Sequence, residues 1–310
     1  MNRFYKKKKI SLSFQLILNK IWRDRVSYLF CLPYVVLFLI FTVIPVLISM
    51  FFSLTSFNIL QPPKWQGLNN YITLFLKDEI FLISLKNTLI LATITGPVSY
   101  LMCLLFAWGI NELTPKIRAF VTLLFYAPSI SGNAYLIWTL LFNGDSYGLV
   151  NGMLLKLGVI NTPIQFFTDT KYMMPLVIVV VLWMSLGTSL LVFIAGFQGI
   201  DKTYYEAASV DGIKNRFQEL WYVTLPMMKP QLMFSAIMSI TASFNIGDAI
   251  TGLVGFPSTE YAVHTMMHHL QDFGTVRFEM GYASAIATLL FVIMVGANKL
   301  IQNLLEKIGG

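Results

Sequence analysis

The chain has 310 residues, of which 56% are hydrophobic and only 12% are charged. Soluble domains carry about 25% charged residues. With a mean hydropathy of +0.68, this composition excludes an ordinary soluble protein and indicates an integral membrane protein. The net charge of +7 and the run Lys6-Lys7-Lys8-Lys9 favour contact with anionic membrane lipid, and no nucleic-acid partner is expected.

The N-terminal residues 1–26 are predicted to form a basic cytoplasmic tail. Within it, residues 11–22 place apolar side chains near one helical face, which is typical of a short helix at the membrane interface. The apolar run after Arg25 is far longer than the core of a signal peptide, and no small-residue cleavage site follows it. We therefore expect this segment to be retained as the first membrane span.

Six apolar segments follow in residues 27–305, each near the roughly 20 residues needed to cross a hydrocarbon core. Asp248 makes the fifth segment the weakest prediction. The fold class is therefore predicted to be all-α and integral to the membrane. The six predicted transmembrane helices are residues 28–54, 88–110, 119–142, 174–196, 231–254 and 280–302.

The distribution of lysine and arginine predicts the orientation of these spans. If the N-terminus lies in the cytoplasm, sixteen of the 22 basic residues fall in cytoplasmic segments and six in external ones. Cytoplasmic loops of membrane proteins carry the excess of positive charge. Both termini are therefore predicted to be cytoplasmic, in a multi-pass protein of a cell membrane.

A polar block, residues 197–229, separates the fourth and fifth predicted spans. Asp201 can cap a helix over about 202–210, and Gly212 allows a tight turn. A second short helix is expected over about 215–222, ended by Pro226 before the next span. The block is either a rigid docking element or a plain connector at the interface, and the spacing alone leaves both open.

This block resembles the EAA loop of ABC importer permeases, in which Glu206-Ala207-Ala208 is followed by Asp211-Gly212 and later by Leu225-Pro226. Over residues 28–302 the chain resembles permeases of binding-protein-dependent carbohydrate uptake, of the maltose-system F and glycerol-phosphate-system A type. Leu220 and Val223 are mild apolar departures from that pattern. Three further segments carry the likeness: Trp65-x-Gly67-Leu68-x-Asn70-Tyr71, Leu85-x-Asn87-Thr88-Leu89 and Gly281-Tyr282-Ala283-Ser284-Ala285.

The resemblance implies a type I ABC importer permease fold in a bacterial cell membrane. It implies three kinds of partner: a second permease subunit, two ATP-binding cassette subunits and an extracellular sugar-binding protein. ATP and magnesium would be used by the partner subunits, so this chain would be no enzyme and would bind no cofactor. The residues that would couple the ATPases to the spans are Glu206, Ala207, Ala208, Asp211, Gly212 and Pro226.

The substrate path is predicted from polar and aromatic residues inside the spans, which usually face the bundle interior or a cavity. For each of them, helix packing or an interfacial position is the alternative. The partner permease can also hold the substrate. The candidates are Asn133, Trp138, Trp183, Ser185, Ser243, Asn245 and Asp248.

Other chemistries have weaker support in the sequence. Neither G-x-x-x-x-G-K-[ST] nor G-x-G-x-x-G is present, and no arrangement of catalytic residues is evident. His264 and His268 stand four residues apart beside His269, but no further metal ligand is evident. No metal site is therefore expected, and exposed polar residues of an external loop are the preferred interpretation of the histidines.

Two alternatives remain open within transport. One is a permease for another polar solute, such as glycerol phosphate or a polyol. The other is an ion-coupled secondary transporter that uses Asp248. Dependence of uptake on internal ATP and an external binding protein would separate the importer from the ion-coupled transporter. The sequence does not identify the sugar or its length.

Overall fold

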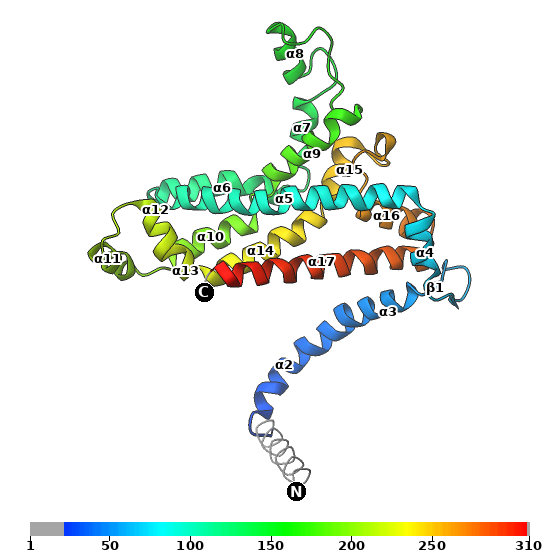
Figure 1. Cartoon of the computed structure of the whole chain (residues 1–310), viewed down its shortest axis with the longest axis horizontal. Helices are drawn as coiled ribbons and strands as arrows, with labels where there is room; N and C mark the ends of the chain where they lie inside the picture. The colour runs from blue at the N-terminus through cyan, green and yellow to red at the C-terminus, as the bar shows by residue number, and fades with distance from the viewer. Residues whose placement is uncertain (1–21, 309–310) are drawn as a thin grey trace. The chain divides into compact units, whose positions relative to one another are not determined.

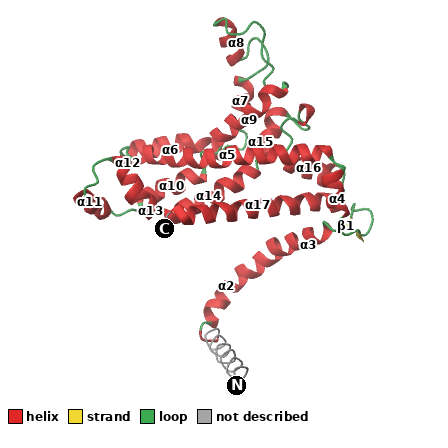
Figure 2. Ribbon diagram, viewed as in Figure 1, coloured by secondary structure: helices red, strands yellow, loops and turns green. Residues whose placement is uncertain are grey.

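The computed structural model describes residues 22–308, with side chains to residue 305. The predicted interfacial helix over 11–22 lies almost wholly outside the described residues. The chain falls into two compact units, divided between Phe52 and Ser53. Figure 1 shows the helices coloured in chain order. In these described residues the chain is built almost entirely from helices (Figure 2), which agrees with the predicted all-α class.

The first unit contains α2 (Arg25–Phe38), the π turn η1 (Leu39–Val43) and α3 (Ile44–Phe52). The π turn lies directly before Pro45, whose missing N–H leaves the carbonyl of Phe41 without its helical partner. No residue of the most apolar window in Arg25–Phe52 is buried within the chain. Such a surface needs lipid or another transmembrane helix to cover it.

The second unit begins with a small hairpin, in which β1 (Thr55–Ser56) pairs antiparallel with β2 (Lys64–Trp65). The helix α4 (Asn69–Leu76) follows. The buried Asn70 side chain donates to the carbonyls of Ser53 and Thr55 at 2.8 and 2.9 Å. This explains one conspicuous residue of the segment Trp65–Tyr71, since Asn70 ties α4 to the hairpin.

The helix α5 (Glu79–Asn111) is central to the second unit. Its 33 residues span about 50 Å at 1.5 Å per residue, which exceeds the roughly 30 Å hydrocarbon core. It continues through Pro97 without a break. The two ends of α5 therefore lie on opposite sides of the membrane.

Five helices come next in the chain. They are α6 (Pro115–Ile130), α7 (Tyr135–Leu141), α8 (Leu149–Lys156), α9 (Thr170–Met184) and α10 (Thr188–Gln198). Asn151 of α8 is fully buried and donates to the carbonyls of Asn143 and Ile164, so this loop is closed on itself.

The polar block and the last third of the chain follow. Their elements are α11 (Lys202–Val210), α12 (Arg216–Glu219), the π turn η2 (Leu220–Thr224), α13 (Leu225–Met227), α14 (Lys229–Phe244), α15 (Gly247–Val254), the 3-10 turn η3 (Thr259–Tyr261), α16 (Met266–Gln271), the π turn η4 (Asp272–Val276) and α17 (Met280–Ile308).

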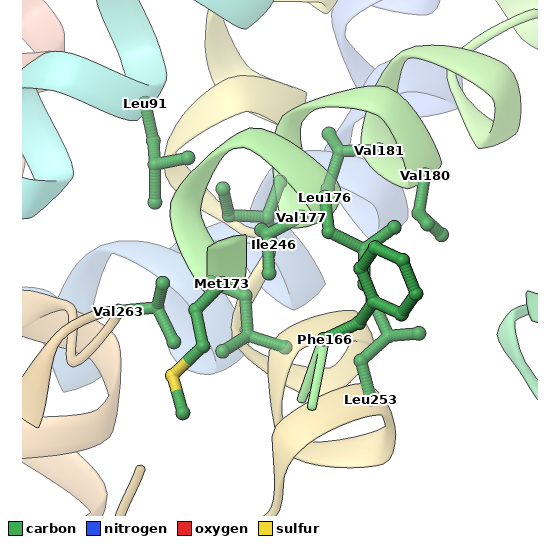
Figure 3. Close-up of a cluster of buried hydrophobic side chains, with 11 residues drawn as sticks. Leu91, Phe166, Met173, Leu176, Val177, Val180, Val181, Ile246, Leu253 and Val263 are labelled. Carbon is green, nitrogen blue, oxygen red and sulfur yellow. The ribbon is translucent and has the colours of Figure 1, made fainter. Parts of the chain in front are cut away.

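The hydrophobic core follows α5 along its length in three clusters of buried side chains. One contains Leu91 together with residues of α9 and α15 (Figure 3). A second contains Cys103 with residues of α10, and a third contains Phe81 with residues of α14 and α17. Because α5 contributes to every cluster, it is the helix against which the others pack.

The predicted spans correspond to three long helices and three bent pairs within residues 22–308. The long segments are Arg25–Phe52, Glu79–Asn111 and Met280–Leu305. The pairs α6 with α7, α9 with α10, and α14 with α15 bend by 87°, 41° and 41°. The second span begins nine residues earlier than expected, because Asp78 caps it and Glu79 stabilises its first turn.

Two other segments singled out in the sequence join loops to spans at the Asp78 end of α5. The side chain of Asn87 donates to the carbonyls of Tyr261 and His264 at 3.1 and 3.0 Å. The N–H of Gly281 donates to the carbonyl of Phe57 at 2.9 Å. A Cβ on Gly281 would lie 2.2 Å from the carbonyl oxygen of Thr55, so only glycine allows this approach.

Candidate functional site

The helix α11 of the polar block is fixed at its start by Asp201, as predicted. The Asp201 carboxylate accepts a hydrogen bond from the N–H of Thr203 at 3.0 Å. This hydrogen bond also lowers the pKa of Asp201 from its usual value. The helix therefore begins with a charged cap, which suits the positive end of its dipole.

The turn after α11 depends on Gly212, which has a φ of +96°. The N–H of Ile213 bonds to the carbonyl of Ala208 at 3.0 Å, which closes a Schellman motif. A residue with a β-carbon rarely adopts this backbone conformation. The positive φ predicted for Gly212 is confirmed, and it sets the direction in which the chain leaves α11.

The surface of α11 presents a carboxylate beside small and apolar groups. Glu206 and Ala207 are exposed, whereas Ala208 is buried against the rest of the block. Val210 is 87% exposed and Tyr204 is 51% exposed. Asp211 is exposed as well. Exposed apolar groups beside a carboxylate are costly in water, so this surface is suited to contact with another protein or with lipid.

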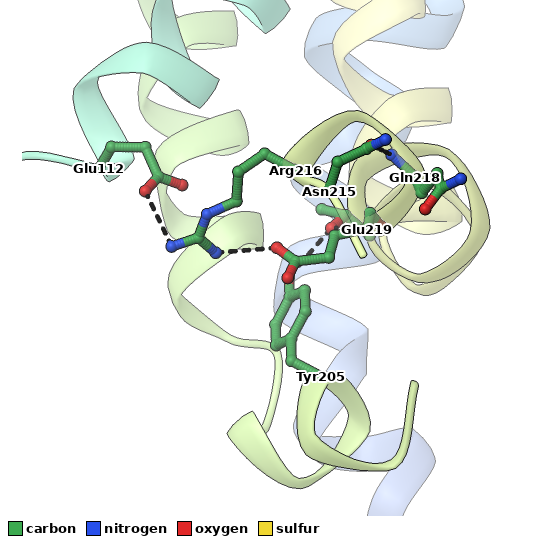
Figure 4. A network of polar contacts seen from close by, with 7 residues as sticks. Glu112, Tyr205, Asn215, Arg216, Gln218 and Glu219 are labelled. Carbon is green, nitrogen blue, oxygen red and sulfur yellow. Dashed lines mark hydrogen bonds and ion pairs between the residues drawn. The ribbon is translucent and has the colours of Figure 1, made fainter. Parts of the chain in front are cut away.

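Arg216 connects the polar block to the end of α5. Its guanidinium lies 3.3 Å from the Glu112 carboxylate and 2.8 Å from that of Glu219 (Figure 4). The hydrogen bond to Glu219 and the nearby charge of Glu112 raise the pKa of Arg216. Glu112 immediately follows α5, so the ion pairs join the α12 segment to the central helix.

A cavity of about 810 Å³ lies at the Asp78 end of α5, and a second one of about 670 Å³ lies at its Glu112 end. Glu206, Arg216 and Glu219 line the second cavity together with Trp108 of α5. The hydroxyl groups of Tyr205 and Thr224 are 3.0 Å apart and tie α11 to the π turn η2. The polar block is therefore braced internally by Tyr205 and joined to the end of α5 by the ion pair between Arg216 and Glu112.

The expectation that Pro226 ends the second short helix is wrong. After the short α12, the chain passes through the π turn η2 directly into α13, and Pro226 occupies the first turn of α13. The π turn directly before it accommodates the proline, which cannot donate the hydrogen bond of a continuing α-helix. The break before α14 falls at Met228 instead.

All seven predicted substrate-path residues lie at or within about one turn of the three helix breaks. Asn133 lies between α6 and α7, Ser185 between α9 and α10, and Asn245 between α14 and α15. The other four lie on the flanking turns: Trp138, Trp183, Ser243 and Asp248. Neither of the two cavities includes any of the seven among its lining residues.

The structure brings some of these seven residues together and separates others. The rings of Trp138 and Trp183 meet edge to face at 5.6 Å. The buried Nε1 of Trp138 has no hydrogen-bond partner among the described residues. Asn133, Asn245 and Asp248 are exposed. Ser243 is buried, and a Cβ on Gly96 would lie 3.3 Å from its hydroxyl, so this serine serves close packing between α14 and α5.

The interpretation of the three histidines as exposed polar residues is wrong. His264, His268 and His269 are each at most 3% exposed. His268 accepts from the N–H of Thr265 through Nδ1, and its Nε2 lies 3.1 Å from the carbonyl of Gly247. Burial lowers the pKa of His264 to about 3, and it lowers the pKa of the other two histidines as well. Within residues 22–308 no group of three or more His, Cys, Asp or Glu is placed to hold a metal ion.

Sequence reasoning missed a buried polar network around Asp78. The Asp78 carboxylate caps α5 and also accepts from His269 at 2.9 Å and from Tyr282 at 2.7 Å. Burial alone would raise the pKa of Asp78, but these hydrogen bonds outweigh it and lower the pKa. The pair Asp78-Glu79 before an apolar run is a helix-start pattern that signals the cap, although nothing in the sequence signals the distant partners.

No known protein-family model matches the sequence. The chain is 34% identical over 274 residues to the probable ABC transporter permease protein YesP of Bacillus subtilis (strain 168), with 86% of each chain covered. It is 30% identical over 283 residues to the arabinooligosaccharides transport system permease protein AraP of the same organism, with 88% of each chain covered.

The fold is similar to a chain of a bacterial ABC transporter that imports the acidic polysaccharide alginate. The TM-score is 0.72 at 28% identity, with 93% of this chain and 98% of that chain covered. In the complex with an alginate pentasaccharide-bound periplasmic protein, the TM-score is 0.75 at 25% identity, with 94% and 97% covered. Since a relative at 34% identity aligns over most of both sequences, the chain belongs to the permease family of ABC transporters for carbohydrate import.

Proposed function

We propose that this permease forms half of a heterodimeric pore that admits an oligosaccharide delivered by an extracellular binding protein. Two separate ATP-binding cassette subunits use ATP and magnesium on the cytoplasmic side. The surface of α11 docks on one of them and transmits its movement to the spans. AraP and the alginate transporter handle oligosaccharides or polysaccharides by their names, which supports a sugar of more than one unit.

The observation that carries this proposal is the geometry of the polar block. Glu206 and Ala207 are exposed on a helix whose start and end are fixed by Asp201 and Gly212. A carboxylate on such a surface can pair with a basic residue of a partner, while alanine allows close approach. The ion pairs of Arg216 carry any displacement of the block toward the end of α5.

Two facts support the orientation in this proposal, with the polar block and both termini in the cytoplasm. The ends of α5 are separated by more than the hydrocarbon thickness, so the polar block and the Asp78 end lie on opposite sides. Placing the polar block in the cytoplasm leaves only six of 22 basic residues outside. In this arrangement each bent pair crosses the membrane once and both termini are cytoplasmic.

The substrate path in this proposal passes the three helix breaks. Every one of the seven polar or aromatic candidates lies near a break, and a break frees backbone donors and acceptors that a continuous helix would satisfy internally. Discontinuous helices are the elements with which transporters contact polar solutes inside the bilayer. Trp138 and Trp183 add aromatic surface at the break between α6 and α7.

The test is sugar uptake into proteoliposomes that contain the complete transporter and its binding protein. Glu206→Lys reverses the docking charge, and Gly212→Pro forces a φ near −65° where the turn needs +96°. Both variants should assemble with the second permease but lose more than about nine-tenths of ATP-dependent uptake, since a tenfold loss needs only about 1.4 kcal/mol of coupling. Co-purification of the ATPase subunits should fall in parallel.

Two matched variants serve as controls. Gly212→Asn should keep most uptake, because asparagine tolerates positive φ. Glu206→Gln keeps the size and the hydrogen bonding of the side chain but not its charge, and should give an intermediate loss. Normal uptake by Glu206→Lys and Gly212→Pro, or uptake that follows an ion gradient without ATP, would refute the coupling role.

A further inference from the structure

The cavity at the Asp78 end of α5 has no role in the coupling mechanism. Its volume of about 810 Å³ is in the range that holds small organic ligands, about 300–1,000 Å³. It lies between the loop after β1, the helix α4 and the starts of α5 and α17. In the proposed orientation it opens on the external side, where sugar arrives.

One wall of this cavity is fixed by buried hydrogen bonds. Asp78, His269 and Tyr282 line it and bond to one another at 2.9 and 2.7 Å. Asn70 also lines it and donates to the carbonyl of Ser53, which precedes β1, and to that of Thr55 in β1. A wall so constrained keeps its shape without a ligand, which reduces the entropy lost on binding.

The remaining wall offers hydrogen-bonding groups without partners. The side chains of Asn69, Thr73 and Glu279 line the cavity and make no side-chain hydrogen bond to any described residue. The rings of Phe273 and Tyr282 supply apolar surface beside them. Hydroxyl-binding groups next to aromatic rings are the combination that a saccharide requires, because its ring has polar edges and apolar C–H faces.

The charge of the lining selects among saccharides. Asp78, Glu79 and Glu279 place three carboxylates in the cavity. Two cations line the cavity, Lys77 and Arg277. Arg277 is already paired with Asp272 at 2.7 Å and lies over the ring of Phe273 at 4.4 Å, so Lys77 is the cation without an ion pair among the described residues. The unpaired carboxylates therefore outnumber the unpaired cation, and an acidic sugar would be repelled.

We propose that this cavity is a saccharide-binding site for neutral sugars on the external face of the permease, separate from the path at the helix breaks. The site holds one end of an oligosaccharide as it leaves the binding protein. Its external position rests on the proposed function. The assignment as a saccharide site rests on the volume, the fixed wall, the free hydroxyl-binding groups and the excess of carboxylates.

The test uses a single cysteine placed in the cavity of the assembled transporter. The exposed Cys31 is first replaced by serine, while the buried Cys103 remains. Thr73→Cys puts a thiol in the cavity, and Leu76→Cys puts one on the same helix, 78% exposed and outside the cavity. The rate of maleimide labelling is then measured with free maltotriose, lactose or arabinotriose, with alginate trisaccharide, and with unliganded binding protein.

At least one neutral sugar at millimolar concentration should slow labelling of Thr73→Cys by threefold or more, without changing labelling of Leu76→Cys. Alginate trisaccharide should have no effect. Protection by no neutral sugar, or equal protection by the acidic sugar, would overturn the proposal. Protection by unliganded binding protein alone would also overturn it and identify a protein-docking surface. Labelling does not depend on ATP coupling, so failure here is distinguishable from failure of the proposed coupling role.

Discussion

The two ends of α5 are built in opposite ways. At the Glu112 end, exposed ion pairs hold the polar block, and the surface of its helix α11 is exposed. At the Asp78 end, a half-buried carboxylate, buried histidines and a glycine without room for a β-carbon hold the loops. Exposed ion pairs contribute about 0–1 kcal/mol, whereas breaking a buried network costs more. One end can therefore move and dock, while the other keeps its shape.

The largest loss of stability should come from a substitution at Gly281, which lies close to the backbone of Thr55. Gly281→Ala places a methyl group 2.2 Å from the carbonyl oxygen of Thr55, and we expect a loss of about 3 kcal/mol in unfolding free energy. Thermal unfolding in detergent measures it. Gly296→Ala is the matched control on α17, because a Cβ there meets nothing within 4 Å. Equal stability of the two variants would contradict a constrained Asp78 end.

The next largest losses of stability should come from the two aspartates that cap helices, Asp78 before α5 and Asp201 before α11. Asp78→Ala leaves His269 and Tyr282 without their acceptor and should cost about 2 kcal/mol. Asp201→Ala removes a cap of the same type at the exposed end and should lower the unfolding temperature less. If the exposed cap proved the more important for stability, the contrast between the two ends would be reversed.

A smaller loss of unfolding free energy is expected when the pH is lowered. The pKa of His264 is about 3 in the folded chain, against about 6.5 when unfolded, so between these values the unfolded chain binds the extra proton. Stability should therefore fall as the pH decreases, by about 2 kcal/mol for His264 between pH 6.5 and about pH 5. Unfolding temperatures across this range measure it.

The variant His264→Phe separates the histidine from other acid effects, because phenylalanine has a similar ring and no titrating group. It should show a shallower loss of stability over the same pH range. Asp78 does not contribute there, since its lowered pKa confines its loss to more acidic solutions. An unchanged slope would show that His264 does not titrate on unfolding.

The sequence predicted the local features of the polar block at the Glu112 end of α5, because they arise from neighbouring residues. The Asp201 cap and the positive φ of Gly212 each follow from a few adjacent positions. The helix breaks were not predicted, because an apolar run looks the same whether the helix bends or continues. Ser185 and Asn245 were selected for polarity, and the structure adds that each lies at a break.

The Asp78 end was the harder part to predict from sequence. Its hydrogen bonds join residues nearly two hundred positions apart, such as Asp78 and His269. Three histidines in a loop between spans suggested exposure, but partners from other helices bury them. Similarly, Pro226 was expected to end a helix because proline usually does, whereas the preceding π turn accommodates it.

The three bent pairs have a consequence for solvent. Non-helical backbone at membrane depth is tolerated only where protein buries it or a water-filled space adjoins it. Asn133, Asn245 and Asp248 are exposed at these bends, so in a bilayer they require either a companion chain or a hydrated interior. Much of the polar surface at these bends is main chain, and a side-chain substitution leaves the main chain's amides and carbonyls in place.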